Sequence, residues 1–363
     1  MNKDEFFMRY ALALAEKAKG HTSPNPMVGC VIVKNGEVLA NGYHKRAGLP
    51  HAEAEALAKI RYKAKGATLY VNLEPCSHFG KTPPCADAIV KYGIKKVVAA
   101  MTDPHSLVKG EGFDILRKNK IQVVNGVLEK EARELNRVFI KNKEQGLPYI
   151  IMKAGISLDG KIALSNRTSQ WITGEATRQK NQELRLENDA IAVGIGTILK
   201  DNPFLDCRTD KTKKIKKVIF DSHGRLDITA NIFKYAAPKD VFVFTQTMPK
   251  AKIKLFEKHG VNVIISKNTA EGIDVKKAVA IMLKKGIGSL VVEGGGALLT
   301  SFLQAKLFDE GRFYIAPKFI GNDGIPVVGE LGMKRLEKAY QLVNVKVETI
   351  GTDIMVKGEF SYV

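Results

Sequence analysis

Two stretches, HAEAEAL at His51–Leu57 and PCSHFGKTPPC at Pro75–Cys85, decide the fold of the first part of the chain. His51, Cys76 and Cys85 supply one imidazole and two thiolates. Three protein ligands leave a fourth zinc position open for water, as in catalytic zinc sites and not in closed structural ones. Glu53 lies two residues after His51, where its carboxylate can shuttle protons without binding the metal. The alternatives are a structural zinc site or two unrelated core cysteines.

The ligand order is typical of zinc nucleobase deaminases, which carry H-x-E followed by P-C-x-x-C. Here eight residues separate the two cysteines instead of two. We expect one zinc ion, which would make hydroxide available near neutral pH. Both cysteines are expected near the start of a helix, where the dipole favours the thiolate. His78, in the insert, is expected to be solvated.

Outward from this site, residues 1–145 alternate helical and strand-like patterns. Asn35-Gly36 is a strong hairpin signal between two apolar runs. We therefore expect a compact α/β domain with its sheet between layers of helices. The predicted helices are 4–19, 51–62, 84–92, 112–119 and one long helix, 129–144; the predicted strands are 28–33, 38–43, 67–73, 96–101 and 121–124.

Gly146-Leu147-Pro148 breaks this pattern and predicts a linker, so that residues 146–363 form a second domain. Helices and strands alternate again, which indicates another α/β sheet with an antiparallel C-terminal hairpin. The predicted strands are 149–156, 190–194, 217–221, 241–245, 261–266, 289–293, 311–316, 342–350 and 352–360; the predicted helices are 175–187, 275–285 and 297–305.

Length and composition agree with two globular domains. The 363 residues are 45% hydrophobic and 26% charged, which excludes a disordered or fibrous chain. No apolar run approaches the roughly 18 residues needed to cross a bilayer. Because the first residues carry acids and lack a small-residue cleavage site, we expect a cytoplasmic protein.

The net charge of +19 comes almost equally from the two parts, with +9 in residues 1–145 and +10 in the remainder. Such a balance suits nucleic acid or small phosphorylated ligands, and a lysine-rich proteome would also produce it. The densest cluster, Lys211, Lys213, Lys214, Lys216 and Lys217, is interpreted as a solvated loop.

Two glycine-rich turns follow strands of the second domain, at Val193–Thr197 and Glu293–Ala297. Glycines at a strand-to-helix turn let a pyrophosphate approach the backbone and the helix N-terminus. A plain tight turn would also explain either one. Since two such ends occur in one sheet, a shared ligand site is favoured, although no G-x-G-x-x-G fingerprint is present.

The stretch TSPNPMVGCVIV at Thr22–Val33, together with HAEAEAL and PCSHFGKTPPC, resembles the bifunctional deaminase–reductases of riboflavin biosynthesis, the RibD or RibG family. The resemblance covers essentially the whole chain. The resemblance implies a cytidine-deaminase-like first domain. Met152–Lys161 and Ser169–Thr173 resemble the family's second half, which implies a dihydrofolate-reductase-like fold that uses NADPH. One departure is His105-Ser106, where the family has Asn-Pro, and this puts a substrate contact in doubt.

The resemblance also implies site residues. The NADPH set is Gly155, Trp171, Thr197, Asp201, Ser222, Gly295, Gly296, Ala297, Leu298, Leu299, Thr300 and Ser301. The substrate set is Asn25, Ser169, Arg185, Leu205, Arg208 and Glu293. Lys153, on the first strand of the second domain, is added for its chemistry, because its ammonium could orient the sugar hydroxyls.

Residue chemistry fits these roles. Arg185 and Arg208 can clamp a phosphate. Ser222, His223 and Arg225 could receive the 2′-phosphate of the cofactor, or form a polar turn. Asn25 could read a pyrimidine edge or cap a turn, and Trp171 could be a core residue.

The expected function is a two-step enzyme. It would deaminate 2,5-diamino-6-(5-phosphoribosylamino)pyrimidin-4-one by zinc-hydroxide attack and then reduce the ribosyl group of 5-amino-6-(5-phosphoribosylamino)uracil to ribityl. Its partners would be small phosphorylated pyrimidines, with no nucleic acid or membrane, in a homo-oligomer (tetramer or dimer). The alternative is a nucleic-acid-acting zinc deaminase of the tRNA-editing type with an accessory domain; a redox-regulated zinc module without catalysis is a weaker one.

Overall fold

The computed structural model describes residues 2–60, 64–79, 83–105, 109–234, 236–266 and 272–362, and the structural statements below concern these residues. The chain divides into two compact units, Met1–Leu147 and Pro148–Val363. This boundary lies two residues beyond the expected one. Among the described residues, no helix is both long and apolar enough to cross a membrane.

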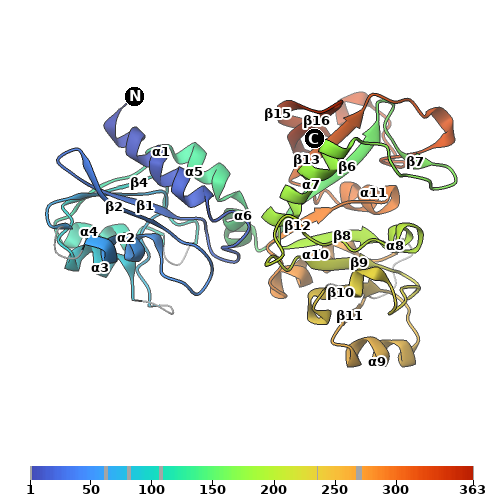
Figure 1. Ribbon diagram of the computed structural model, residues 1–363, viewed down its shortest axis with the longest axis horizontal. Helices are drawn as coiled ribbons and strands as arrows, with labels where there is room; N and C mark the ends of the chain where they lie inside the picture. The colour runs from blue at the N-terminus through green and yellow to red at the C-terminus, as the bar shows by residue number, and fades with distance from the viewer. Residues whose placement is uncertain are drawn as a thin grey trace. The chain divides into compact units, whose positions relative to one another are not determined.

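The first unit is a sheet between two layers of helices (Figure 1). Its strands lie in the order β2-β1-β3-β4-β5. Helices α1 and α5 cover one face, and α2, α3 and α4 cover the other. The strands are β1 (Gly29–Lys34), β2 (Glu37–Tyr43), β3 (Thr68–Val71), β4 (Lys96–Ala99) and β5 (Gln122–Val124); the helices are α1 (Lys3–Glu16), α2 (Ala52–Ile60), α3 (Cys85–Lys91), α4 (Glu111–Lys118), α5 (Glu129–Leu135) and α6 (Arg137–Gln145).

The three-layer prediction is confirmed, with two qualifications. The predicted end of the 51–62 helix lies outside the described residues. The single helix predicted over 129–144 is wrong, because Asn136 divides it into α5 and α6. The Asn136 amide accepts a hydrogen bond from the Met27 N–H (2.8 Å) and donates one to the Met27 carbonyl (3.0 Å). The side chain thus anchors the 22–28 loop, which leads into β1.

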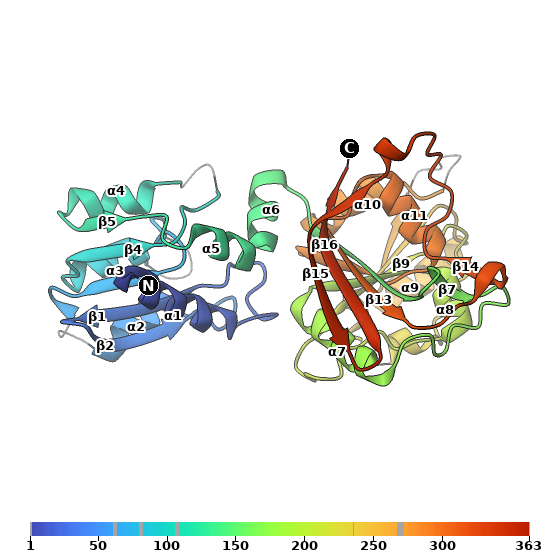
Figure 2. The ribbon, with the colours of Figure 1, turned by 90° about the horizontal axis from the view of Figure 1, so that it is seen from above.

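The second unit is built on one mixed sheet in the order β11-β10-β9-β8-β12-β6-β13-β16-β15. Its strands are β6 (Tyr149–Ser157), β8 (Ala190–Gly194), β9 (Lys216–Phe220), β10 (Val241–Thr245), β11 (Asn262–Ile265), β12 (Ser289–Val292), β13 (Glu310–Ala316), β15 (Gln341–Ile350) and β16 (Asp353–Ser361). The run from β11 to β13 is parallel, and β16 and β15 are antiparallel to their neighbours. Figure 2 shows the β15–β16 hairpin at one end of this sheet.

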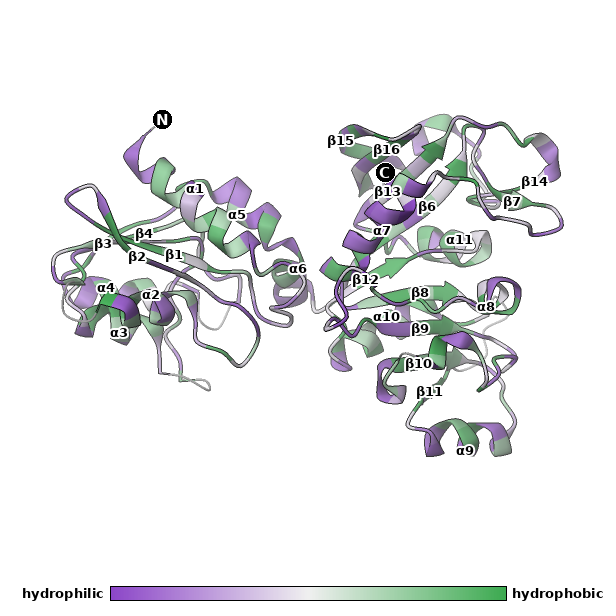
Figure 3. Cartoon of the chain, viewed as in Figure 1, coloured by the Kyte–Doolittle hydropathy of each residue, from purple (hydrophilic) through white to green (hydrophobic). Residues whose placement is uncertain are grey.

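α-Helices connect most of the parallel strands, as is usual in a parallel sheet. They are α7 (Glu175–Glu187), α8 (Ile195–Asp201), α9 (Lys250–Lys258), α10 (Val275–Lys284) and α11 (Gly296–Gln304). A small two-stranded sheet pairs β7 (Lys161–Leu164) with β14 (Gly324–Pro326). In Figure 3 the sheet strands are mostly hydrophobic and α7 is mostly hydrophilic, consistent with a core built around the sheet. The sequence prediction did not identify β7, α8, α9 or β14.

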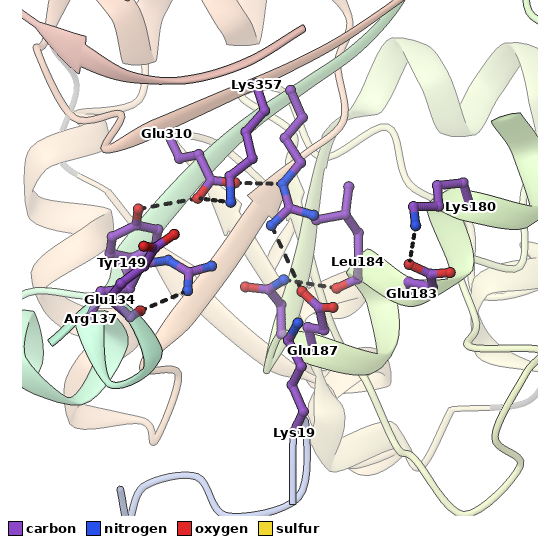
Figure 4. A network of polar contacts seen from close by, with 12 residues as sticks. Lys19, Glu134, Arg137, Tyr149, Lys180, Glu183, Leu184, Glu187, Glu310 and Lys357 are labelled. Atoms are coloured by element: carbon purple, nitrogen blue, oxygen red, sulfur yellow. Dashed lines mark hydrogen bonds and ion pairs between the residues drawn. The ribbon is translucent and has the colours of Figure 1, made fainter. Parts of the chain in front are cut away.

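A buried carboxylate joins α7 to the antiparallel end of this sheet. Glu310 on β13 accepts a hydrogen bond from the Tyr149 hydroxyl (3.3 Å) and lies 3.6 Å from the Lys357 ammonium (Figure 4). Arg312 contacts both Glu310 and, at 3.8 Å, Glu187 on α7. These contacts connect β6, β13, β16 and α7.

Candidate active sites

The three predicted zinc ligands come together at the N-termini of two helices. His51 immediately precedes α2, and Cys85 is the first residue of α3. The Nδ1 atom of His51 lies 3.6 Å from Sγ of Cys76 and 3.3 Å from Sγ of Cys85. Zinc bonds of about 2.0–2.3 Å in a tetrahedron place ligand atoms about 3.5 Å apart, so the set fits zinc.

Both cysteines were expected near a helix start, but only Cys85 lies at one; Cys76 is hydrogen-bonded to the first turn of the same helix. The Cys85 N–H, the first of α3, donates a hydrogen bond to Sγ of Cys76 at 3.3 Å. The contact with the Cys85 thiol is the largest cause that lowers the pKa of Cys76, and the His51 ring adds to it. This surrounding favours a thiolate, the form that binds a metal.

Glu53 lies in the first turn of α2 and lines the same cavity as His51 and Cys76. Its side chain is buried, with 3% of the residue exposed. Burial raises the pKa of Glu53 to about 7 in the absence of a metal. A carboxylate that lines the cavity without belonging to the His51–Cys76–Cys85 set matches the placement expected of a proton shuttle.

Asn25 is held at this cavity by a histidine that the sequence analysis missed. The Asn25 amide nitrogen lies 3.1 Å from Nε2 of His44, and Nδ1 of His44 lies 3.0 Å from the Pro50 carbonyl oxygen. With Nδ1–H donating to Pro50, Nε2 accepts from the Asn25 amide. The Asn25 side chain therefore contacts His44 and not its own turn, which is closed by the Asn25 N–H donating to Thr22 (2.8 Å).

Glu74, just before the Pro-Cys pair, was also missed. Its buried carboxylate accepts backbone hydrogen bonds from Asp103 (3.0 Å), Gly110 (3.0 Å), Gly112 (2.9 Å) and Phe113 (3.4 Å). Glu74 and Asp103 both line the cavity. The carboxylate thus fixes a cavity wall relative to the Cys76 segment. A Glu directly preceding Pro-Cys was the only sequence signal, and the pattern of four amide donors is visible only in three dimensions.

The cavity has a volume of about 670 Å³, and the departure from the family pattern lies on its wall. His105 lines it, and its N–H donates to Asp103 (2.8 Å); Ser106 lies outside the described residues. His78, expected to be solvated, is exposed and also lines the cavity.

In the second unit, the two glycine-rich turns lie side by side, as expected. They follow the neighbouring strands β8 and β12, and the Gly194 N–H donates to the Gly294 carbonyl at 3.1 Å. Helix α11 begins at Gly296, so Ala297–Ser301 form its first turns. Thr197 and Asp201 lie on α8, which starts directly after β8. Since β8 and β12 are parallel, both helix N-termini lie at the carboxyl edge of the sheet.

Arg185, Glu293 and Lys153 form a charged group at the same edge. The Arg185 guanidinium donates to Glu293 from Nε (3.4 Å) and from a terminal nitrogen (3.0 Å), and to the Asp206 carbonyl (3.0 Å). Burial alone would raise the pKa of Glu293, but the charges of Arg185 and Lys153 outweigh it and hold the pKa at about 2. Burial lowers the pKa of Lys153.

The remaining predicted residues differ in their exposure. The Arg208 side chain is 72% exposed, whereas Leu205, three residues earlier, is buried. Trp171 is 61% exposed and the Arg178 guanidinium stacks on its ring at 4.4 Å, so the core alternative for this tryptophan is wrong. Gly155 is on β6, and Ser169 lies between β7 and α7.

Ser222 follows β9, and its carbonyl accepts from the N–H groups of Gln246 (3.1 Å) and Thr247 (3.0 Å). His223 and Arg225, beside it, are both exposed, and Arg225 lies 4.0 Å from Asp221.

Comparison with known proteins identifies both units. The cytidine and deoxycytidylate deaminase zinc-binding region matches residues 1–101, and the RibD C-terminal domain matches residues 148–356. The riboflavin biosynthesis protein RibD of Aquifex aeolicus is 43% identical over 354 residues, which cover 97% of each chain. The chain belongs to the RibD family.

Further members agree with this assignment over the full length. The Escherichia coli RibD is 38% identical and is matched over 97% of this chain and 98% of its own. A solved structure of Acinetobacter baumannii RibD superposes with a TM-score of 0.91 at 35% identity, and covers 99% of each chain. A Thermotoga maritima structure, described as a diaminohydroxyphosphoribosylaminopyrimidine deaminase/5-amino-6-(5-phosphoribosylamino)uracil reductase, has a TM-score of 0.84 at 35% identity and 99% coverage of each chain.

Membership of the RibD family settles the class of enzyme. The chain is a bifunctional deaminase and reductase of riboflavin biosynthesis, with a zinc-binding deaminase domain followed by a reductase domain that uses NADPH. These full-length matches do not favour the nucleic-acid-acting alternative.

Proposed function

We propose that this chain performs two successive steps on one phosphoribosylated pyrimidine. The first unit deaminates 2,5-diamino-6-(5-phosphoribosylamino)pyrimidin-4-one, and the second reduces the ribosyl group of 5-amino-6-(5-phosphoribosylamino)uracil to ribityl. The observation that carries this proposal is the cavity that gathers His51, Cys76, Glu53 and Asn25, with Cys85 beside them, in a chain whose second unit matches a reductase.

In the deaminase site, His51, Cys76 and Cys85 hold the zinc ion, which when bound lets water act as a nucleophile near neutral pH. Glu53 takes the proton released by the water and delivers it to the pyrimidine as the amino group leaves as ammonia. Its position supports this role, since the buried Glu53 carboxylate lines the cavity without belonging to the ligand set and is left to accept and release a proton.

Asn25 orients the pyrimidine. Because its amide nitrogen is held by His44, its carbonyl oxygen is left to accept a hydrogen bond from a ring N–H or amino group of the substrate. A cavity of about 670 Å³ is large enough for the ring and the attached sugar phosphate.

In the reductase site, NADPH supplies the hydride. The N-terminus of α11, with Gly295 and Gly296 before its apolar turns, is suited to the pyrophosphate of the cofactor. Gly155, Trp171, Thr197, Asp201, Ser222 and Ala297–Ser301 complete the proposed cofactor contacts.

The sugar phosphate is bound by residues at the same edge of the sheet. Glu293 is ionised and fixed by Arg185, so it can accept hydrogen bonds from ribose hydroxyls, while Lys153 donates to them. Arg208, with its exposed guanidinium, grips the phosphate, and Ser169 and Leu205 line the sugar.

We also propose a homo-oligomer. Strand β15 is an edge of the large sheet, and Val343, Val345 and Val347 on it are 41%, 48% and 67% exposed. An edge strand with exposed valines is suited to pairing with a second copy. A cytoplasmic location is supported by the four free cysteines, two of which must stay reduced to bind zinc.

The experiment that tests the function uses the full chain and both substrates. With zinc bound, the diaminopyrimidine should release ammonia and, in the presence of NADPH, lead to NADPH oxidation. After removal of zinc by a chelator, the diaminopyrimidine should give neither signal, while the aminouracil should still be reduced. Reduction of the diaminopyrimidine by zinc-free protein would contradict the proposed order, and editing of tRNA would favour the alternative.

A further inference from the structure

Four of the five lysines in the 211–217 cluster line a second cavity, and the interpretation of this cluster as a solvated loop is wrong for Lys217, which is buried. The cavity has a volume of about 380 Å³ and is lined by Lys211, Lys213, Lys214, Lys217, Asp206 and Asp240 among others. We call it the lysine cavity. It lies entirely within the second unit, and none of the residues proposed above for NADPH or substrate lines it.

Lys217 occupies a position in the sheet that normally holds an apolar side chain. It lies two residues before Ile219 on β9, so the two side chains share a face. Its partners across the ladder are Ile191 on β8 and Val241 on β10, and all three neighbours belong to one hydrophobic cluster. Only 1% of Lys217 is exposed.

The buried ammonium of Lys217 is incompletely satisfied. It donates one hydrogen bond, to the Ile232 carbonyl at 2.8 Å, although an ammonium carries three donors. No other described residue accepts a hydrogen bond from it. Burial lowers the pKa of Lys217 to about 8, which reflects the cost of keeping this charge in the core. A bound anion would offset that cost.

Asp206 gives the cavity a second unsatisfied group of opposite sign. Its Oδ1 atom is buried and receives no hydrogen bond within the described structure, and Arg208 lies 3.8 Å from it. Four lysines against two aspartates leave an excess of two positive charges around the cavity. That excess matches a phosphate monoester dianion, and a hydroxyl donor on the same ligand would satisfy Asp206.

We propose that the lysine cavity binds a sugar phosphate, with its phosphate at the ammonium groups of Lys213 and Lys217 and a sugar hydroxyl donating to Asp206. The site is separate from the reductase substrate site, but the two are adjacent along the chain. Asp206 and Cys207 line the lysine cavity, whereas Leu205 and Arg208 on either side of them belong to the proposed substrate site. Occupation of the cavity therefore fixes the segment that carries Arg208.

The test is calorimetric titration of the full-length protein with ribose 5-phosphate at constant ionic strength. Arg208→Ala is used as background, because it removes the proposed phosphate contact of the reductase site. In this background we expect one ribose 5-phosphate per chain. Adding Lys217→Met should weaken binding about tenfold or more, as for loss of a charge-assisted hydrogen bond. Lys213→Met, at the more accessible end of the cavity, should act in the same direction if Lys217→Met folds poorly.

Lys216→Met is the matched control. Lys216 is the neighbouring residue on β9, but its ammonium is bonded to the Gly286 carbonyl (2.6 Å) and does not line the cavity. This variant should bind within about twofold of its parent, since only general charge is lost. Ribose without the phosphate should not bind measurably.

Two results would overturn the proposal. One is that Arg208→Ala alone abolishes all binding of ribose 5-phosphate, which would assign the ligand to the reductase site. The other is that Lys217→Met and Lys213→Met both bind like their parent. A further titration distinguishes the source of the ligand. If 5-amino-6-(5-phosphoribosylamino)uracil displaces ribose 5-phosphate, the ligand is the enzyme's own pyrimidine; if it does not displace it, the ligand is a free sugar phosphate. Both results support the site.

Discussion

Arg185 on α7 and Glu293 after β12 form a two-point ion pair across 108 residues of sequence, with contacts of 3.4 and 3.0 Å. Both side chains are nearly buried, at 12% and 9% exposed. Because the guanidinium is already directed at Glu293 and the Asp206 carbonyl, Arg185 is better placed to fix Glu293 than to clamp a phosphate alone. Arg208 is 72% exposed and its Nε lies 3.8 Å from Asp206, too far for a hydrogen bond, so it is the better candidate for the proposed phosphate contact.

Replacing Arg208 by Lys should raise the KM for the aminouracil and leave the KM for NADPH nearly unchanged. A lysine cannot reproduce two parallel hydrogen bonds to one phosphate. Because 72% of the Arg208 side chain is exposed, loss of this contact should cost about 1 kcal/mol, as for exposed ion pairs. Ser222→Asp should do the reverse, because its carboxylate would repel the 2′-phosphate of NADPH. Steady-state kinetics of both variants against both ligands checks this; wild-type kinetics for Arg208→Lys would refute the phosphate contact.

Cys76→Ser should lose both zinc and deaminase activity while the aminouracil is still reduced. A serine hydroxyl is a poor zinc ligand, and the reductase residues lie in the other unit. Metal analysis and assays of both half-reactions measure this. Cys207→Ser, at a cysteine of the second unit that does not belong to the His51–Cys76–Cys85 set, is the control and should keep its zinc. Full zinc occupancy in Cys76→Ser would remove Cys76 from the ligand set.

Glu53→Gln should keep zinc bound while deamination falls by about a hundredfold or more. The amide has the shape of the carboxylate but cannot accept and release the proton. Glu55→Gln is the matched control, since Glu55 lies on the same helix, contacts Lys45 and Lys59, and does not line the cavity. If Glu53→Gln lost zinc in parallel with activity, Glu53 would be a ligand or a structural support.

Glu74→Gln should destabilise the first unit and lower kcat/KM of deamination, with reduction unaffected. The Gln side chain has one acceptor oxygen, so two of the four backbone donors on Glu74 lose their partner. Buried unsatisfied donors cost about 1–3 kcal/mol each. Thermal unfolding and both assays measure the effect. Glu111→Gln serves as the control, because Glu111 is exposed and its carboxylate accepts a hydrogen bond from the Ser77 hydroxyl (3.0 Å). An equal loss of stability and activity in Glu111→Gln would argue against the anchoring role of Glu74.

The stability of the wild type relative to Lys217→Met should increase with pH between about 8 and 10.5. The pKa of Lys217 is lowered to about 8 in the folded chain from 10.5, so the unfolded state binds more protons in this window and stability rises with pH. Asp206 and Arg185 are the charged groups that act on it. Denaturant unfolding of both proteins at pH 7, 9 and 10.5 measures the difference. A difference that does not change with pH would show that Lys217 is not a buried ammonium.

Local chemistry made much of the deaminase site predictable. His51, Glu53 and Cys85 are placed by helix starts, which short sequence signals reveal. His44, in contrast, was not predicted, because its role depends on a contact with Asn25 from another loop. The division of 129–144 at Asn136 also escaped prediction, since the side chain of Asn136 is bonded to Met27, 109 residues away, and no local signal reveals that contact.

Hydrophobic periodicity, turn residues and motif spacing are local properties, and they were enough to predict the two α/β units, most of their helices and strands, and the His51–Cys76–Cys85 set. Which polar groups meet depends instead on contacts between distant segments. The adjacency of β8 and β12, the pair between Arg185 and Glu293, and the burial of Lys217 beside Asp206 all arise from strand order in one large sheet. Strand order depends on long-range pairing, and that pairing sets the burial and charge environment of each side chain.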